Sequence, residues 1–140
     1  ARALAFGLAE EGATLAIANR TQQKAIDLAR ALSASWCPVS QLHEVKADIV
    51  ANTTSLGMYP NTEGMPYPAD LLKPHMLVFD AVYNPRRTKL LEVAQQAGCR
   101  TVEGVSMLVH QGAVQFELWT GQKAPVEIMR KVVLDELATP

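Results

Sequence analysis

Residues 14–24 read TLAIANRTQQK, and this stretch decides the predicted fold. The apolar run at 15–18 is too short for a buried helix, so it predicts a buried parallel strand. Apolar residues at helical spacing follow at once and predict a helix over residues 22–33. Thr21 lies between the two as a suitable N-cap, whose hydroxyl would accept from amides of the first helical turn. A strand that runs directly into a helix is typical of an α/β fold.

The same turn predicts an anion site. Free amides and the positive end of the helix dipole converge there, and Arg20 and Lys24 add positive charge. In a dinucleotide fold the tip of the second strand meets the adenosine ribose, where Asp or Glu selects NAD and Arg accommodates the extra phosphate of NADP. Asn19, Arg20 and Thr21 include no acid, so the tip predicts NADP. A solvated basic turn is the alternative that this stretch alone leaves open.

Helices and strands alternate along the whole chain, which predicts an α/β fold with a Rossmann-like, doubly wound parallel sheet in one domain over residues 1–140. Pro38 would confine its strand to an edge of the sheet. The loop at 53–70 is long for a compact domain, and loops of this length usually have a function. The predicted helices cover residues 1–11, 22–33, 40–45, 88–97, 105–119 and 126–137, and the predicted strands cover 14–18, 36–39, 48–52, 76–82 and 100–102.

A nucleotide-binding half normally opens with a strand and a glycine-rich turn before its first helix. This sequence starts at that helix, so we expect a sheet that lacks its first strand and its glycine-rich loop. In the usual strand order the absent strand lies between strands 14–18 and 48–52 and would leave two exposed edges. We therefore expect the 140 residues to fold poorly or to aggregate alone. A cooperative thermal transition of a monomer would contradict that expectation.

The composition excludes several classes of function. The chain is 49% hydrophobic and 19% charged with a formal net charge of −1, which gives no basis for binding nucleic acid or a membrane surface. No apolar run reaches the length of a membrane span. Cys37 and Cys99 form no Cys-x-x-Cys pattern and are expected as reduced thiols of an intracellular protein. With the histidines they give no metal-ligand spacing, and no Gly-x-Ser-x-Gly elbow is present.

Polar side chains follow two further predicted strands. Parallel sheets place ligands at the carboxyl ends of their strands. Residues 52–55 read NTTS, whose hydroxyls and amides could hold ribose and phosphate, and residues 80–85 read DAVYNP, which places a phenol at a turn. A polar turn with capping hydroxyls and a packed tyrosine are the alternatives.

The helix at 105–119 has two faces. An apolar stripe from Val105 through Val109 and Phe116 to Trp119 predicts core packing. Met107, Gln111 and Gln115 share another face at intervals of four residues, which solvent exposure explains as well as ligand binding does.

Taken together and in order, these motifs resemble the NADP-binding C-terminal half of the shikimate dehydrogenase family. Monofunctional members and the shikimate dehydrogenase half of the plant-type bifunctional dehydroquinate dehydratase–shikimate dehydrogenase look similar here. The matching stretches are ANRT at 18–21, ANTTSLGMYP at 51–60, FDAVYNP at 79–85 and EGVSMLVHQGAVQFELWTG at 103–121.

The resemblance implies that the parent protein reversibly reduces 3-dehydroshikimate to shikimate with NADPH, in aromatic amino-acid biosynthesis. It implies that Asn19, Arg20 and Thr21 bind the adenosine 2′-phosphate. Lys24 stands where many members have Arg and keeps the positive charge. The resemblance implies that Tyr83 and Gln111 contact the small-molecule substrate. The further cofactor-binding positions that it implies are Asn52, Thr53, Thr54, Ser55, Ala81, Gly104, Met107 and Leu108.

The resemblance also places the family's catalytic Lys and Asp in an N-terminal substrate domain that this sequence does not include. We therefore expect no catalytic residue in this chain and no dehydrogenase activity from it alone. Two alternatives stay open: a quinate/shikimate dehydrogenase that prefers NAD, and a non-catalytic nucleotide-binding module. The expected compartment is cytoplasmic for a bacterial protein and plastid for a plant or algal one, and the oligomeric state is not predicted.

Overall fold

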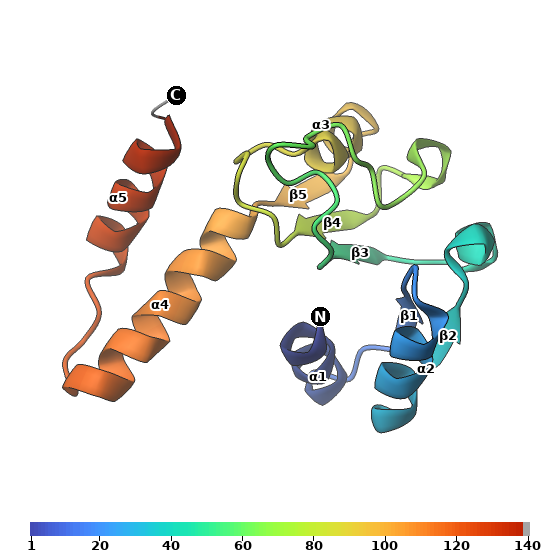
Figure 1. Cartoon of the computed structure of the whole chain (residues 1–140), viewed down its shortest axis with the longest axis horizontal. Helices are drawn as coiled ribbons and strands as arrows, with labels where there is room; N and C mark the ends of the chain where they lie inside the picture. Colours follow the sequence, from blue (N-terminus) through green and yellow to red (C-terminus); the bar gives the residue numbers. More distant parts are fainter. Residues whose placement is uncertain (139–140) are drawn as a thin grey trace. The chain divides into compact units, whose positions relative to one another are not determined.

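A computed structural model describes residues 1–138 and shows helices and strands alternating as predicted (Figure 1). The chain divides into two compact units, Ala1–Ala47 and Asp48–Pro140. The elements of the first unit are α1 (Arg2–Glu10), β1 (Ala16–Ala18), α2 (Gln22–Ala31), β2 (Ser35–Cys37) and the 3₁₀-helix η1 (Val39–Glu44). Those of the second are β3 (Ile49–Asn52), the 3₁₀-helix η2 (Ala69–Leu71), β4 (Leu77–Asp80), α3 (Lys89–Gln96), β5 (Arg100–Val102), α4 (Gly104–Thr120) and α5 (Val126–Ala138).

The first unit is built on two parallel strands joined by a helix. β1 pairs with β2, with Ile17 opposite Trp36, and α2 makes the connection between them. α1 ends as predicted at Gly12, whose φ of +83° lets the amides of residues 12 and 13 turn back onto the last helical carbonyls. β1 is less buried than predicted, because a strand paired on one side in a two-stranded sheet has little cover.

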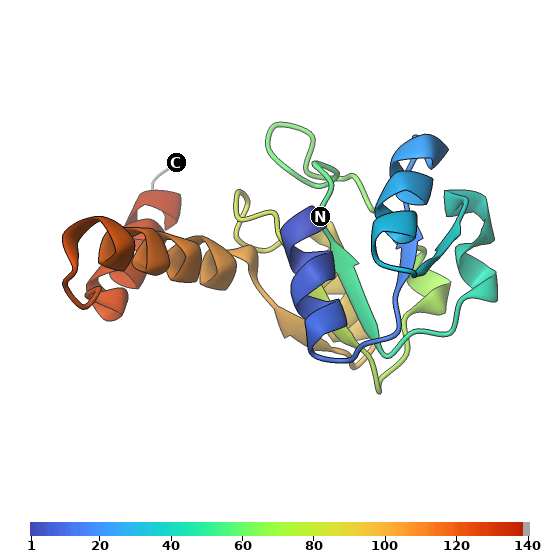
Figure 2. The same cartoon turned by 90° about the horizontal axis from the view of Figure 1, so that it is seen from below.

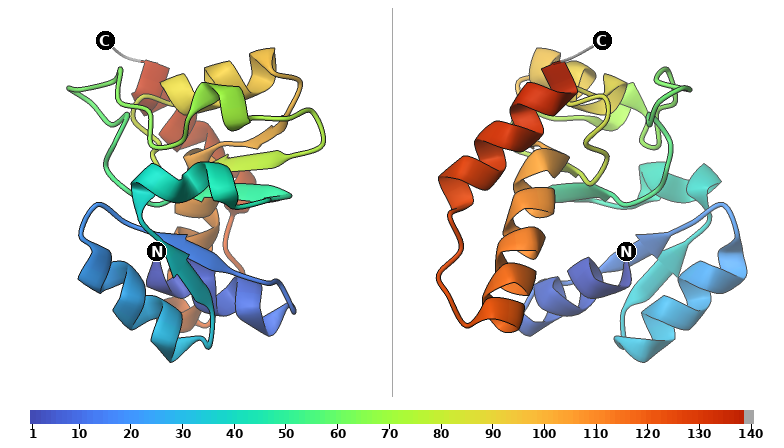
Figure 3. Two further views of the ribbon diagram at one scale, coloured as in Figure 1. Left: turned by 90° about the vertical axis from the view of Figure 1, so that its right-hand side faces the viewer. Right: turned by 60° about the vertical axis from the view of Figure 1, so that its left-hand side comes forward.

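The second unit contains a three-stranded parallel sheet in the order β3-β4-β5. α3 connects β4 to β5 and lies over one face of this sheet (Figure 3). Val78 of β4, Leu90 of α3 and Val105 of α4 are fully buried and mark the core. Thr88 is the N-cap of α3, and its hydroxyl accepts from the amide of Leu91.

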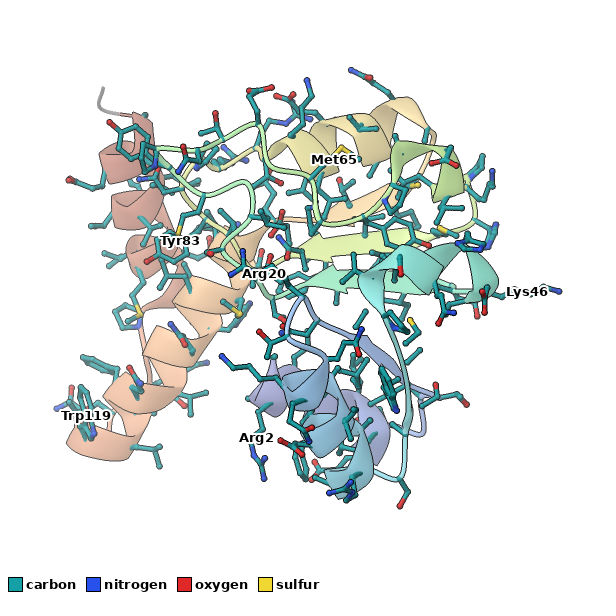
Figure 4. All side chains as sticks on the ribbon, turned by 45° about the vertical axis from the view of Figure 1, so that its right-hand side comes forward. Arg2, Arg20, Lys46, Met65, Tyr83 and Trp119 are labelled. Carbon is teal, nitrogen blue, oxygen red and sulfur yellow. The ribbon has the colours of Figure 1, made fainter. Side chains whose placement is uncertain are left out.

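α4 and α5 lie side by side and run in opposite directions (Figure 2). Arg130 Nη2 of α5 donates to Ser106 Oγ of α4 at 3.0 Å. Val109 is buried as predicted, but Trp119 is 81% exposed and the prediction of core packing is wrong there (Figure 4). The reason is geometric, since the second half of α4 packs beside α5 rather than on the sheet.

The strand pairings agree with the predicted doubly wound order, although the sheet is divided. β1 pairs with β2, and β4 pairs with both β3 and β5, so within residues 1–138 β1 and β3 each keep one unpaired edge. The short helix expected at 40–45 is η1, which begins one residue before Ser40; Pro38 occupies its N-cap position and makes no side-chain capping bond. None of the helices in the described part of the chain has the length and apolar character that a membrane crossing requires.

Candidate functional site

The turn after β1 presents positive charge to solvent. Arg20, Thr21 and Lys24 are all exposed, and Asn19 Oδ1 accepts from the Thr21 amide at 2.9 Å and so shapes the turn. The first turn of α2 contains no acidic residue, and no ion pair engages Arg20 or Lys24 among residues 1–138. Two uncompensated cations beside a helix start suit a phosphate group.

One detail of this turn differs from the sequence prediction. Thr21 occupies the N-cap position of α2 as predicted, with an extended backbone, but its side chain makes no capping hydrogen bond. The side chain of Asn19 instead turns inward to the backbone of residue 21, because an Asn two residues before an amide readily closes such a turn. The hydroxyl of Thr21 therefore stays exposed with the two cations.

The carboxyl ends of β3 and β4 form an open pocket of about 470 Å³. Asn52 and Asp80 are opposite each other in the strand register, so the loops that follow them leave the sheet side by side. Both loops carry polar groups predicted from the sequence, and Tyr83 (Figure 4) is 42% exposed at this edge. The residues that line the pocket are Thr53, Thr54, Ser55, Met58, Tyr59, Ala81, Val82, Tyr83 and Asn84.

Asn52 supports the pocket from beneath rather than lining it. Its side chain is 4% exposed, and its Oδ1 accepts from the Thr54 amide at 2.9 Å and from Thr54 Oγ1 at 2.8 Å. Its Nδ2 donates to Asp80 Oδ1 at 2.9 Å and more weakly to the Leu56 carbonyl at 3.3 Å. The carboxamide is used within the protein, so the Asn52 side chain supports the pocket, and cofactor binding by Asn52 stays a prediction.

Asp80 is a fully buried acidic residue of this site. Its side chain has no exposed surface, and it accepts from Asn52, from the Val82 amide at 3.0 Å and from Thr88 Oγ1 at 2.7 Å. Burial raises the pKa of the Asp80 carboxyl above its ordinary value, while the hydrogen bonds from Thr88, Val82 and Asn52 work in the opposite direction.

The loop between β4 and α3 is held at further points. The Tyr59 amide donates to the Asn84 carbonyl at 3.0 Å, which joins this loop to the one after β3. Arg86 Nε donates to Glu103 Oε2 at 2.8 Å, which ties the loop to the start of α4. Tyr83 therefore projects from a segment that is fastened on both sides.

The start of α4 touches the backbone of the same loop. Gly104 is buried, and a Cβ atom there would lie 2.5 Å from the Val82 carbonyl oxygen and 2.7 Å from that of Ala81. Only a glycine allows this approach. Met107, Leu108 and Gln111, predicted to contact cofactor or substrate, follow on α4 and are not among the residues that line the pocket.

Four further residues line the pocket without a role assigned from the sequence. Met58, Tyr59, Val82 and Asn84 lie within the quoted stretches 51–60 and 79–85, and their residue types alone did not mark them as pocket residues. Asp80 could be found from the sequence, because an acidic residue at the end of an apolar strand is buried only where hydrogen-bond donors surround it, and Asp80 is fully buried. Within residues 1–138 no group of three or more His, Cys, Asp or Glu side chains forms a metal site.

Comparison with known proteins connects this geometry to a family. The family described as the Shikimate 5'-dehydrogenase C-terminal domain matches residues 104–134. The NADP-dependent shikimate dehydrogenase of Methanosarcina acetivorans is 48% identical over 146 residues, which cover 98% of this chain and 52% of that relative. The chain belongs to the shikimate dehydrogenase family. It spans about half the length of the curated relatives it matches.

Solved structures support the same relationship. The shikimate 5-dehydrogenase of Thermus thermophilus, in complex with NADP(H) and shikimate, aligns with 95% of this chain and 50% of its own at a TM-score of 0.86 and 32% identity. The quinate dehydrogenase of Corynebacterium glutamicum, in complex with NAD, aligns with 96% of this chain and 51% of its own at a TM-score of 0.89 and 30% identity. The fold is therefore the Rossmann-like fold of these dehydrogenases.

Proposed function

We propose that the full-length gene product that includes this chain interconverts 3-dehydroshikimate and shikimate with NADP, and that this chain is its NADP-binding domain. The observation that carries the cofactor assignment is the turn after β1, with exposed Arg20 and Lys24 and no acid in the first turn of α2. An acidic side chain at this place would accept from the ribose hydroxyl of NAD and repel a 2′-phosphate. The names of the relatives support the reaction.

When bound, the cofactor would donate or accept the hydride, and the chain supplies its binding groups. Arg20, Lys24 and the amides of the turn would hold the 2′-phosphate, and Thr53 and Ser55 would lie along the rest of the nucleotide. Tyr83 would present its phenol to the substrate from the pocket wall. We assign the proton-transferring Lys and Asp to the part of the parent protein outside these residues, as the family resemblance implies.

The two alternatives make different demands on the site. A non-catalytic nucleotide-binding module has no use for a tyrosine in the pocket, so Tyr83 argues for an enzyme. The alternative of a quinate dehydrogenase that uses NAD is supported by the similarity to the Corynebacterium glutamicum structure. The acid-free turn at 19–21 favours NADP over NAD.

The deciding experiment compares Arg20→Ala with wild type in the full-length gene product. We expect the affinity for NADPH to fall about 10- to 100-fold, because a charged hydrogen bond to phosphate contributes about 1.5–3 kcal/mol. The affinity for NADH should change less than about twofold. Arg30→Ala is the matched control, since Arg30 is exposed in the last turn of the same helix. Equal weakening of NADPH and NADH by Arg20→Ala would refute the assignment.

The substrate is tested in the same preparation. Wild type should reduce NADP with shikimate at a higher kcat/KM than with quinate. A preference for quinate with NAD would establish the alternative, and the absence of turnover with either acid in a protein that binds NADP would favour the non-catalytic module.

A further inference from the structure

Asp80 contacts three separate segments of the second unit. Asn52 ends β3, Val82 lies in the loop after β4, and Thr88 caps α3, and each donates one hydrogen bond to this one carboxyl group. Oδ1 accepts from Asn52 and Val82, and Oδ2 accepts from Thr88. The side chains of Asp80, Thr88 and Asn52 are 0%, 1% and 4% exposed, so water does not compete for these bonds.

A buried carboxylate is unfavourable unless it is well supplied with donors. A simple structural purpose would be met by an apolar residue, since Asp80 follows the apolar run of β4 and lies in the same core. A carboxyl group differs in one respect: it has two acceptor atoms and can bind donors from several segments at once. Here it joins two strand ends and a helix cap.

The joined segments are those that carry the pocket. Asn52 Oδ1 accepts from the amide and the hydroxyl of Thr54, which fixes the start of the loop after β3. Thr54 Oγ1 in turn accepts from the Leu56 amide at 3.1 Å. On the other side, Val82 directly precedes Tyr83. Both walls of the pocket therefore start at hydrogen bonds to the same carboxylate.

We propose that Asp80 is the positioning residue of this pocket, and that through Asn52, Val82 and Thr88 it holds the two walls at a fixed spacing before any ligand arrives. Asp80 does not touch the ligand. Its effect on turnover, which rests on the proposed function, comes from keeping Tyr83 and the 53–55 segment in the mutual geometry that hydride transfer requires. The pocket walls themselves are held whether or not shikimate is the substrate.

The test uses the full-length gene product and variants that keep the shape of the site. Asp80→Ala would leave three buried donors unpaired and is expected to destabilise the whole fold. Thr88→Val is therefore the primary variant, because it removes one hydroxyl with little change in volume. Thr88→Ser keeps the hydroxyl and should restore the wild-type behaviour. Thr101→Val on β5 is the matched control, since Thr101 is exposed, pairs with Val78 and is not among the residues that line the pocket.

Two measurements are made on each variant. Hydrogen exchange should become at least about tenfold faster at the amides of Val82 and Thr54 in Thr88→Val. The kcat for shikimate oxidation, per enzyme that binds 2′,5′-ADP, should fall about tenfold, while the affinity for 2′,5′-ADP stays unchanged. The affinity for 2′,5′-ADP measures whether the turn at Arg20 is intact. Dividing the rate by the amount of enzyme that binds 2′,5′-ADP corrects kcat for any unfolded protein.

The outcomes separate the two proposals. Unchanged exchange in Thr88→Val would overturn the positioning role, and so would faster exchange with wild-type kcat. A proportional loss of 2′,5′-ADP affinity would also overturn it, because it would show a global effect. If wild type does not oxidise shikimate, the proposed function fails, and the exchange measurement alone then decides whether Asp80 holds the walls of the pocket.

Discussion

Gly104 and Gly112 provide a matched pair of substitutions within α4. Both residues are helical, so alanine fits the backbone at either position and only the surroundings differ. A Cβ at Gly104 would lie 2.5 Å from the Val82 carbonyl oxygen, whereas a Cβ at Gly112 would meet only Met129 Cε at 3.7 Å. The first distance is a clash with backbone, and the second is an ordinary van der Waals contact.

These distances predict effects of opposite sign. In Gly104→Ala the helix start must move by at least about 0.5 Å to bring the carbon–oxygen distance from 2.5 Å to 3.0 Å, and overpacking of this kind destabilises a protein by about 1–3 kcal/mol. Gly112→Ala should stabilise it by about 0.5–1 kcal/mol, because alanine is the better helix former. The two variants should therefore differ by about 1.5–4 kcal/mol in free energy of unfolding.

The measurement is denaturant unfolding of the full-length gene product and both variants, with the KM for shikimate as a second reading. Gly104→Ala should also raise that KM, since the displaced carbonyls belong to the two residues that precede Tyr83. Gly112→Ala should leave it unchanged. A Gly104→Ala variant as stable as Gly112→Ala would refute the close approach of α4 to the loop.

Three further predictions concern the pocket and its supports. Tyr83→Phe should lower kcat/KM for shikimate by about 5- to 20-fold with little change in Tm, because it removes a hydroxyl from an exposed side chain; an unchanged value in steady-state kinetics would remove Tyr83 from the substrate site. Burial raises the pKa of Asp80, so its contribution to the free energy of unfolding is largest below the ordinary carboxyl pKa and falls as the pH rises through the raised value. Urea titrations should therefore show wild type losing stability relative to Asp80→Asn from about pH 4 upward, and a constant difference would contradict the raised pKa. Arg86→Gln removes the ion pair with Glu103, which is partly exposed, and should lower the free energy of unfolding by no more than about 1 kcal/mol; a larger loss in the same titration would show that this pair alone holds the loop.

The sequence predicted the elements well because each has a local signal. Gly12 and Gly98 end their helices at positive φ, as a glycine after a helix usually does, and Thr88 caps α3 through its hydroxyl. The exposure of β1 and of Trp119 was not predictable in this way. Burial depends on which elements pack on a face, and periodicity records only that a face is apolar.

For the candidate site, too, the sequence predicted the location of the polar groups but not their contacts. The sequence located the polar strand ends because parallel topology alone brings the ends of β3 and β4 to one edge. It did not reveal which side chains already bond within the protein: the Thr21 hydroxyl was predicted to cap α2 and makes no such bond, whereas the Asn52 carboxamide bonds to Thr54 and Asp80. Only the register of Asn52 with Asp80 and the burial of both reveal which hydrogen bonds are already made.

The turn after β1 and the pocket at the ends of β3 and β4 differ in how firmly the rest of the protein holds their side chains. In the turn after β1, the two cations that we propose as the cofactor-selecting residues are exposed and make no ion pair within residues 1–138, so their replacement should cost little stability. The pocket walls are different, because Asp80, Thr88 and Gly104 have almost no exposed surface or no room for a side chain. On the proposed assignments, we expect cofactor preference to shift through single exposed residues without disturbing the fold, and substrate preference to shift through residues that line the pocket, such as Tyr83 and Tyr59. This separation gives a physical reason why one fold can serve dehydrogenases bound to NADP(H) and shikimate and others bound to NAD.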